Sequence, residues 1–452
     1  MMNHFIENSN SNFNDDIFIS YKNQKITFSE FYHNVSSKSR SLSRLNISDN
    51  KKIGIYLTNP IDIIEIYFSC IQIDKVPIIF PIDINVQELK QIIVENKIKL
   101  VITEWLQKKN ISSIDKTSFF HIQELSSSFG GCSPIEFESK IKDLNDIQSL
   151  HLTSGSTGIP KLIGLTFNNF INSVSQWNNE LCFLKNDKYI QCLPLNHIGG
   201  LSIIIRSQMI GFESILVNKF STSLINDMID NGATLISLVP SMLKRLINHR
   251  QGRAFPSTLR AIVVGGDNCS NQLMRYALNN KLPIFKTYGM TETCSGVSGF
   301  WLHKHPEMID SVGKRFKGNS ITIINDHVKI SGPTVSPFLE NEKQESNTVY
   351  TKDTGYIDKN FLYLTGRSDD IVISGGENIS LSKIKNILLK HESISDVYIE
   401  TFQDDEFGTL IDIYIELSTL SLNEKDIKNY LLKNLSKNQL PSKIFIVDKI
   451  HH

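Results

Sequence analysis

Residues 152–161 read LTSGSTGIPK, the strongest local signal in the sequence. An apolar, strand-like lead over residues 147–152 precedes it, and two glycines permit backbone conformations that other residues resist. Successive backbone N–H groups can then turn inward and cradle an anion. The stretch lacks Walker A spacing, and a flexible loop would have a similar composition, but the strand before it and the Pro-Lys ending favour a polyphosphate-binding loop. Its hydroxyl, glycine and lysine positions are Thr153, Ser154, Gly155, Ser156, Thr157, Gly158 and Lys161.

On both sides of this loop, short apolar runs alternate with amphipathic segments. Before it, the pattern predicts strands over residues 52–57, 76–80 and 100–103 and helices over residues 60–72 and 86–95. After it, strands over 235–238, 261–264 and 284–285 and a helix over 241–248 continue the pattern. A β-α-β-α-β order favours a parallel sheet covered by helices. The sequence therefore predicts an α/β fold.

From residue 320 the pattern changes to short strands separated by turns, over residues 321–324, 328–330, 348–350 and 361–364. A compact segment follows Arg367, with strands over 396–400, 409–417 and 443–447 and helices over 381–391 and 424–435. We therefore predict a large N-terminal domain over residues 1–367 and a small C-terminal domain over residues 368–452.

The composition is that of an ordinary soluble globular protein, and we expect a cytoplasmic location. Lys+Arg and Asp+Glu balance at 47 each, so no global charge favours nucleic acid. The six cysteines form no C-x-x-C pair, which argues against a zinc site and a disulfide framework. The N-terminus lacks the plan of a signal peptide, and no apolar run approaches the roughly 20 residues that span a bilayer.

A second polar block, YGMTET over residues 288–293, follows the strand predicted at 284–285. The carboxylate of Glu292 is a hard ligand suited to Mg²⁺. The hydroxyl of Thr291 can bond a phosphate oxygen, and the ring of Tyr288 offers a flat face to a nucleobase. Taken alone, this hexapeptide is equally typical of a turn that starts a helix.

A third block extends over residues 353–379 and contains DTGY, GRSDD and SGGENI. The carboxylate of Asp353 can accept hydrogen bonds from two neighbouring ribose hydroxyls, and Arg367 can reach ribose or phosphate. An isolated Asp-Thr-Gly is also found in aspartic proteases. A second copy is missing and the surrounding pattern is α/β, so we set that interpretation aside.

Together, the three blocks resemble the adenylate-forming superfamily, which contains acyl-CoA synthetases, aryl-CoA ligases and peptide-synthetase adenylation domains. The resemblance covers nearly the whole chain. It implies a large N-terminal domain of stacked α/β sheets with a β-barrel-like subdomain, and a small, mobile α+β C-terminal domain. It also implies ATP and Mg²⁺ as cofactors, coenzyme A as co-substrate, a small carboxylic acid as substrate, and a homodimer as a family expectation.

The resemblance further implies roles for individual residues. The loop from Thr153 to Lys161 would hold the β- and γ-phosphates, Thr291 would contact the α-phosphate, and Glu292 would hold Mg²⁺. Asp369 would be the hinge about which the small domain rotates between two half-reactions. The remaining residues would line the adenine and acyl pocket (Gly265, Gly266, Tyr288), bind the ribose (Asp353, Arg367) and line the pantetheine tunnel (Gly375, Gly376).

Within the superfamily, PLNHIGGLS over residues 194–202 and YGMTETC over 288–294 are most similar to the o-succinylbenzoate–CoA ligase family of quinone biosynthesis. This resemblance implies that His197 lies at the mouth of the acyl and pantetheine channel. The alternative is a helix-start histidine satisfied by a backbone carbonyl. Arg206 is a candidate partner for a second substrate carboxylate, but a surface position is the default expectation.

One feature departs from the superfamily, whose members end with a Gly-Lys pair that contacts the α-phosphate and the substrate carboxylate. The lead-in to that pair is present over residues 440–450, but the given sequence stops at His452. Lys449 is a poor substitute, so we assign no C-terminal lysine. A truncated sequence, a different lysine and weak adenylation all stay open. Besides the o-succinylbenzoate ligase, the alternatives are another aryl- or acyl-CoA ligase, a carrier-protein-loading adenylation enzyme, and a non-catalytic nucleotide-binding relative.

Overall fold

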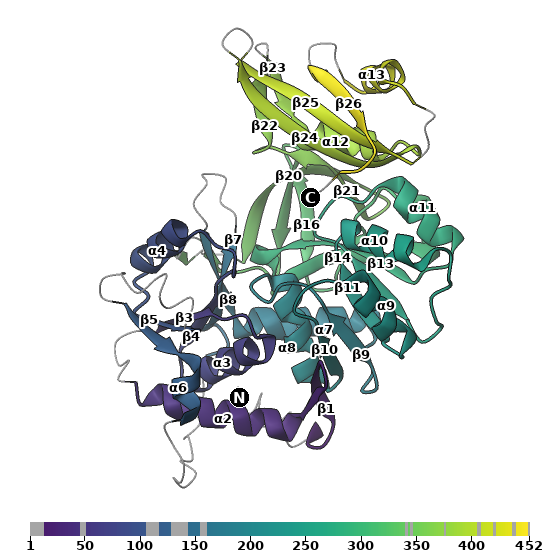
Figure 1. Ribbon diagram of the computed structural model, residues 1–452. Coiled ribbons are helices and arrows are strands. Elements are labelled where there is room, and N and C mark those ends of the chain that lie inside the picture. The colour runs from purple at the N-terminus through teal and green to yellow at the C-terminus, as the bar shows by residue number, and fades with distance from the viewer. Residues whose placement is uncertain are drawn as a thin grey trace.

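In the residues that it describes, the computed structural model contains four β-sheets with helices packed around them (Figure 1). The N-terminal sheets lie in the lower part of Figure 1, and the C-terminal sheet forms a separate body at the top. The residues that the structure describes are 13–45, 51–104, 117–127, 143–153, 161–339, 342–343, 347–374, 377–404, 408–418, 422–435 and 440–450.

The first α/β sheet has the strand order β19-β18-β8-β7-β4-β3-β5-β6. Its helix α3 (Pro60–Gln72) begins where the Asn59 side chain accepts the N–H of Ile61 and where Pro60 fits the first helical position. Helix α4 (Val86–Glu95) is capped in the same way by Asn85. The helix predictions are confirmed, and the predicted strands are present. These strands are β3 (Lys52–Tyr56), β4 (Val76–Ile79), β5 (Leu100–Thr103), β6 (Ser118–His121), β7 (Ile147–Thr153), β8 (Lys161–Thr166), β18 (Phe338–Leu339) and β19 (Glu342–Lys343).

The second α/β sheet has the order β15-β14-β13-β12-β11-β9-β10-β1-β2. Its strands are β1 (Ile17–Tyr21), β2 (Gln24–Thr27), β9 (Lys188–Gln191), β10 (Glu213–Leu216), β11 (Leu235–Leu238), β12 (Ala261–Val264), β13 (Ile284–Met290), β14 (Ser295–Trp301) and β15 (Lys314–Arg315). The helices that accompany the two sheets are α2 (Phe28–Ser43), α6 (Ile122–Ser127), α7 (Phe167–Leu181), α8 (Ile198–Ile210), α9 (Thr222–Asp230), α10 (Pro240–Arg250) and α11 (Asn271–Asn279). One hydrophobic core, with residues from α2, α3, α7 and α8, joins the two sheets.

Strand β13 is longer than the predicted run of residues 284–285, because β14 pairs with it in antiparallel register. This pairing is set by the fold and adds backbone hydrogen bonds that a local sequence pattern does not reveal. It extends the strand through Tyr288 and Gly289 to Met290. The second polar block of the sequence therefore lies at the carboxyl end of a central strand.

A four-stranded antiparallel sheet follows, with the order β16-β17-β20-β21. It occupies the place of the predicted β-barrel-like subdomain. Its strands are β16 (Ser320–Ile324), β17 (His327–Ser331), β20 (Thr348–Asp358) and β21 (Phe361–Arg367). In β20 and β21, Asp353 pairs directly with Arg367, so two residues of the third block are neighbours across the sheet.

The C-terminal sheet has its own hydrophobic core, which includes Ile384, Val397, Ile413 and Leu431. The sheet begins three residues after the predicted domain boundary near Ser368, and that boundary and the mobility of this part stay predictions. Its elements are β22 (Ile371–Ser374), β23 (Glu377–Ser380), α12 (Leu381–Leu389), β24 (Ile394–Asp404), β25 (Gly408–Leu417), α13 (Glu424–Leu432) and β26 (Lys443–Val447). In the described part of the chain, we find no helix with the length and apolar character needed to cross a membrane.

Candidate active site

The predicted polyphosphate loop connects two antiparallel strands of the first sheet. Thr153 ends β7 and Lys161 begins β8, and the two residues are paired across the hairpin. The Thr153 hydroxyl donates to the carbonyl oxygen of Lys161 over 3.4 Å. The strand lead is confirmed, and the loop positions Ser154, Gly155, Ser156, Thr157 and Gly158 lie outside the described residues.

The second and third sequence blocks meet at the side chain of Asp353. The Tyr288 hydroxyl donates to one carboxylate oxygen of Asp353 at 2.5 Å, and Arg367 Nη1 lies 3.0 Å from the other. Arg367 also donates to both oxygens of Asp369, at 2.9 and 3.1 Å. These bonds lower the pKa of Asp369, while burial, together with the nearby Asp353 carboxylate, raises the pKa of Tyr288 well above its ordinary value. Four predicted site residues therefore form one hydrogen-bonded cluster.

Glu292 lies beside this cluster, in the short 3₁₀ helix η1 (Thr291–Thr293) that follows β13. Its backbone carbonyl accepts the N–H of Ser336 at 2.7 Å, which fixes the turn. Burial raises the pKa of the Glu292 carboxyl, and the charges of Arg367 and Asp353 act on it in opposite directions. Among the described residues, no group of three or more His, Cys, Asp or Glu side chains is placed to hold a metal. A single carboxylate beside a phosphate site suits Mg²⁺, which is usually bound by one or two carboxylates together with substrate phosphates.

A pocket of about 450 Å³ opens between the ends of the second sheet's strands and helix α8. It brings together four of the predicted site residues, His197, Gly265, Gly266 and Thr291. Its walls are largely apolar, and the polar groups in its lining include Ser202, Arg206, Ser237 and Ser295. A concave apolar pocket with a few convergent polar groups is typical of a small-molecule site.

His197 is the N-cap residue of α8, but its imidazole makes no capping hydrogen bond. Burial lowers the pKa of His197, and the Asp83 carboxylate raises it to a smaller extent. His197 lines the large pocket, and its place at the mouth of an acyl and pantetheine channel stays a prediction. A neutral imidazole can donate through one nitrogen and accept through the other, so this side chain can orient a polar ligand.

Arg206 is buried, so the default expectation of a surface position was wrong. Arg206 is 2% exposed, and its guanidinium carbon lies 4.3 Å from the centre of the Trp177 ring. Nη2 donates to the Ser295 hydroxyl at 2.7 Å, and burial lowers the pKa of the guanidinium to about 10. Within the part of the chain that the structure describes, Nε has no hydrogen-bond partner. No acidic side chain in the described ranges forms an ion pair with it. The reason is that α8 is apolar on nearly every side, so it is buried all round and leaves no solvent-facing position for the arginine.

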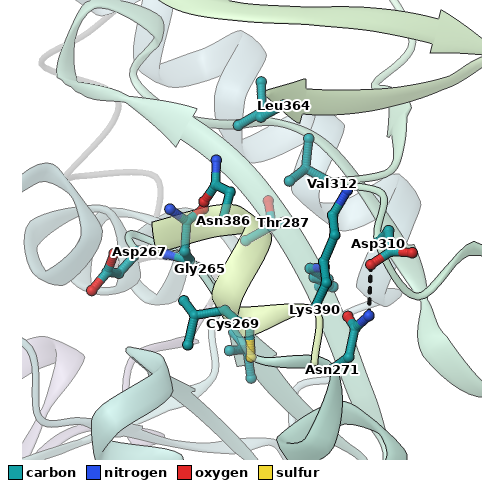
Figure 2. Close-up of a pocket in the computed structure, with 14 residues that line it drawn as sticks. Gly265, Asp267, Cys269, Asn271, Thr287, Asp310, Val312, Leu364, Asn386 and Lys390 are labelled. Atoms are coloured by element: carbon teal, nitrogen blue, oxygen red, sulfur yellow. Dashed lines mark hydrogen bonds between the residues drawn. The ribbon is translucent and has the colours of Figure 1, made fainter. Parts of the chain in front are cut away.

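A smaller cavity lies next to the large pocket and shares Gly265 and Thr287 with it. Asp267 and Asp310 line this cavity, and Asp310 accepts a hydrogen bond from Asn271 at 2.7 Å. Figure 2 shows that Asn386 of α12 and Lys390 at the end of that helix reach this cavity from the C-terminal sheet. The two parts of the chain therefore meet at the edge of the site. Gly375 and Gly376, predicted for the pantetheine tunnel, lie outside the described residues.

Residues 6–335 match the sequence profile of the family described as AMP-binding enzyme. This chain belongs to the AMP-binding enzyme family. It is 29% identical to the 2-succinylbenzoate–CoA ligase of Oceanobacillus iheyensis over 94% of this chain and 91% of that protein. The corresponding ligase of Bacillus cereus strain ATCC 14579 is 24% identical over 96% and 92%.

Solved structures confirm the predicted fold class. The o-succinylbenzoate CoA synthetase of Bacillus subtilis, in complex with its acyl-adenylate intermediate, superimposes with a TM-score of 0.87 at 25% identity, over 99% of this chain and 95% of that chain. The same Bacillus subtilis enzyme in complex with ATP and magnesium ion gives a TM-score of 0.86 at 25% identity, over 99% and 96%. The predicted superfamily is therefore confirmed for this AMP-binding enzyme.

The polar or aromatic groups of the large pocket that sequence reasoning missed include Trp177, Ser237 and Ser295. Ser295 follows the YGMTETC block directly, so its position could have suggested the site. Trp177 and Ser237 lie in segments with no motif, and only the fold brings them into the same pocket as Arg206. The Ser237 hydroxyl forms a 2.7 Å hydrogen bond with the hydroxyl of the buried Tyr189.

Proposed function

We propose that this protein is an ATP-dependent ligase that joins o-succinylbenzoate to coenzyme A. In the first half-reaction, a carboxylate oxygen of the acid attacks the α-phosphorus of ATP, and the bond to pyrophosphate breaks. In the second, the thiol sulfur of coenzyme A attacks the acyl carbon, AMP leaves, and the thiol loses its proton. The observation that carries the proposal is the buried Arg206, which has no acidic partner among the described residues and lines a pocket that also includes Thr291.

The acid has two carboxylates and an aromatic ring, and the large pocket has a counterpart for each. Apolar walls, including Leu238, Val239 and Val263, suit the ring. The Arg206 guanidinium suits the ring carboxylate, because a buried cation without a counterion is strongly stabilised by an anion. The succinyl arm is flexible, so we assign its carboxylate to the reaction near Thr291.

The nucleotide is assigned to the cluster around Asp353. Each carboxylate oxygen has two lone pairs, so both Asp353 oxygens can accept a ribose hydroxyl while they keep Tyr288 and Arg367. We assign the adenine to the neighbouring strand ends at Gly265 and Gly266, and the β- and γ-phosphates to the loop that ends at Lys161. The hydrogen bonds of Asp353 with Tyr288 and Arg367 support the nucleotide assignment, because they join the second and third sequence blocks.

Glu292 is assigned to Mg²⁺. When bound there with the phosphates, the ion would neutralise the charge that develops on the leaving pyrophosphate. Lys161 adds a positive charge on the loop side. Asp369 is assigned as the hinge of the residue 368–452 domain, because its carboxylate holds Arg367 at the end of the large domain and also lies 3.4 Å from Lys352 Nζ. Rotation there would first break these charge-assisted contacts.

A substrate panel read by pyrophosphate release, with and without coenzyme A, tests the proposal. We expect AMP, pyrophosphate and the thioester from o-succinylbenzoate, ATP, Mg²⁺ and coenzyme A. Turnover of other aryl or fatty acids, but not of this one, would reject the acid and keep the ligase class. Transfer only to a carrier protein would indicate a loading enzyme, and ATP binding without pyrophosphate exchange would indicate a non-catalytic relative. Since its substrates are intracellular metabolites, we place the enzyme in the cytoplasm, and a homodimer stays a prediction.

A further inference from the structure

Two successive residues after the YGMTET block have a left-handed backbone. Cys294 has φ of 51° and Ser295 has φ of 87°. Residues other than glycine rarely adopt such angles, which strain the backbone and concentrate at functional sites. Ser295 begins β14 immediately after η1, so the strain fixes the direction of its side chain at the edge of the large pocket.

The hydroxyl of Ser295 receives two hydrogen bonds. Trp177 Nε1 donates to its oxygen at 3.0 Å, and Arg206 Nη2 donates at 2.7 Å. Indole and guanidinium nitrogens can only donate, so both lone pairs of the Ser295 oxygen are occupied. The hydroxyl proton must therefore point to a third group, and among the described residues none accepts it. Ser295 is 8% exposed and lines the pocket.

We infer that Ser295 is a specificity-determining residue that donates its hydroxyl proton to the second carboxylate of the acid, beside Arg206. The inference rests on the proposed function and adds to it. A carboxylate accepts hydrogen bonds and donates none, so it matches the unused proton. Two N–H donors on the oxygen polarise the O–H bond and make it a stronger donor. Arg206 provides positive charge at this end of the pocket, and Ser295 provides a hydrogen-bond donor in a fixed direction.

A purely structural role is the competing explanation, since the same hydroxyl ties α7, α8 and β14 together. The positive φ of Ser295 allows an experiment to distinguish the specificity role from the structural role. Glycine adopts positive φ without steric cost, so Ser295→Gly removes the hydroxyl and relieves the strain at once. The melting temperature of Ser295→Gly should be close to that of the wild type. If the hydroxyl had only a structural role, its loss would change the kcat/KM of all substrates alike.

The experiment compares o-succinylbenzoate with 4-oxo-4-phenylbutanoate, which keeps the reacting arm and lacks the ring carboxylate. For Ser295→Gly and Ser295→Ala, we expect kcat/KM to fall about tenfold for the diacid, mostly through KM, and about twofold or less for the monoacid. Equal effects on both acids, no effect on either, or a selective loss in only one of the two variants would overturn the inference. A wild type that does not turn over the diacid would instead overturn the proposed function.

Lys281→Gly is the matched control. Lys281 also has a left-handed backbone, with φ of 54°, and it lies on an exposed turn between α11 and β13, outside the residues assigned to the site. This change relieves a similar backbone strain, so its kinetics with both acids should equal those of the wild type. A selective loss for the diacid in this variant would show that backbone strain, not the hydroxyl, sets the selectivity, and it would overturn the inference.

Discussion

The Lys244 ammonium lies 2.6 Å from the Glu416 carboxylate, and this ion pair joins α10 of the large domain to β25 of the C-terminal sheet. The same ammonium lies 3.3 Å from the hydroxyl of Ser395, and the second oxygen of Glu416 accepts the N–H of Ile450 at 3.2 Å. The two charged side chains are 25% and 15% exposed. Partial burial weakens solvent screening, so this pair contributes more than a surface pair.

We predict that this ion pair favours the orientation of the residue 368–452 domain that is seen here. If the small domain rotates between half-reactions, Lys244→Glu should change the ratio of ATP–pyrophosphate exchange to thioester formation by about threefold to tenfold. The double variant Lys244→Glu with Glu416→Lys should restore the ratio. Rapid-quench measurement of each half-reaction tests the change in Lys244→Glu and its restoration in the double variant.

A second interdomain pair gives the control for that prediction. Arg275 Nη2 and Glu392 Oε1 are 3.3 Å apart, and their side chains are 55% and 71% exposed. Solvent screens such a pair, so Arg275→Glu should leave the ratio nearly unchanged. Similar shifts from Arg275→Glu and Lys244→Glu would indicate a general effect of surface charge and contradict the role of the buried pair.

The raised pKa of Glu292 predicts a pH dependence. Mg²⁺ binds the ionised carboxylate, and burial favours the protonated form. Pyrophosphate exchange should therefore decline as the pH falls, at a pH above the ordinary range of glutamate, and more Mg²⁺ should move the decline to lower pH, because metal and proton compete. Initial rates of pyrophosphate exchange, measured at low and high Mg²⁺ concentrations across the acid pH range, test this shift. The Glu292→Gln variant should have a low rate of pyrophosphate exchange at every pH. If the pH of the decline in the wild type does not change with the Mg²⁺ concentration, Glu292 is not the metal ligand.

The contact between Tyr288 and Asp353 predicts coupled effects on ATP binding. Asp353→Asn loses the charge that holds Arg367 and replaces one of the two acceptor oxygens for ribose by a donor, so we expect the KM for ATP to rise about tenfold or more. Tyr288→Phe keeps the flat ring and loses one donor, and its effect should be smaller. The double variant should resemble Asp353→Asn alone, since the tyrosine hydroxyl acts on ATP through the carboxylate. Additive losses would show that Tyr288 contacts the nucleotide independently.

Local signals predicted many of the elements well. Helix α3 matches its predicted range because an asparagine cap and Pro60 mark its start. The two strand ranges at Leu235–Leu238 and Ala261–Val264 match because both are short, fully buried apolar runs. The end of β13 could not be predicted in this way, since the polar run around Tyr288 becomes a strand only through its pairing with β14.

The site was predictable as residue types but not as geometry. The sequence blocks identify Tyr288, Asp353 and Arg367 as candidates, yet their hydrogen bonds join positions 65 and 14 residues apart. The unused proton of Ser295 follows from donors on α7 and α8 and from a backbone angle. Neither the long-range hydrogen bonds nor this backbone angle can be predicted from the local sequence. Long-range contacts and strained dihedrals are therefore the part of the site that requires the fold.

A buried hydrogen-bond chain between α3 and β7 gives the last prediction. Gln148 Nε2 donates to the Tyr67 hydroxyl at 3.1 Å, which donates to the Ser149 hydroxyl at 3.1 Å. Ser149 then has its own proton free for His151 Nε2, 2.9 Å away. His151 is 4% exposed, and burial, with the charge of His197 nearby, lowers its pKa to about 3. The chain therefore holds His151 as a neutral acceptor.

Because the folded pKa of His151 lies below the ordinary value near 6.5, the unfolded chain binds a proton that the folded chain does not. Stability from this histidine is fully present above about pH 6.5 and is lost as the pH falls towards 3, by about 1.4 kcal/mol per pH unit. Urea unfolding between about pH 6 and pH 4 should therefore show the wild type losing roughly 2 kcal/mol more than His151→Gln, whose amide stays neutral. His249→Gln, at an exposed position in α10, is the matched control and should keep the wild-type slope. Parallel curves for wild type and His151→Gln would mean that His151 is protonated in the fold, and the direction of the hydrogen-bond chain would then be reversed.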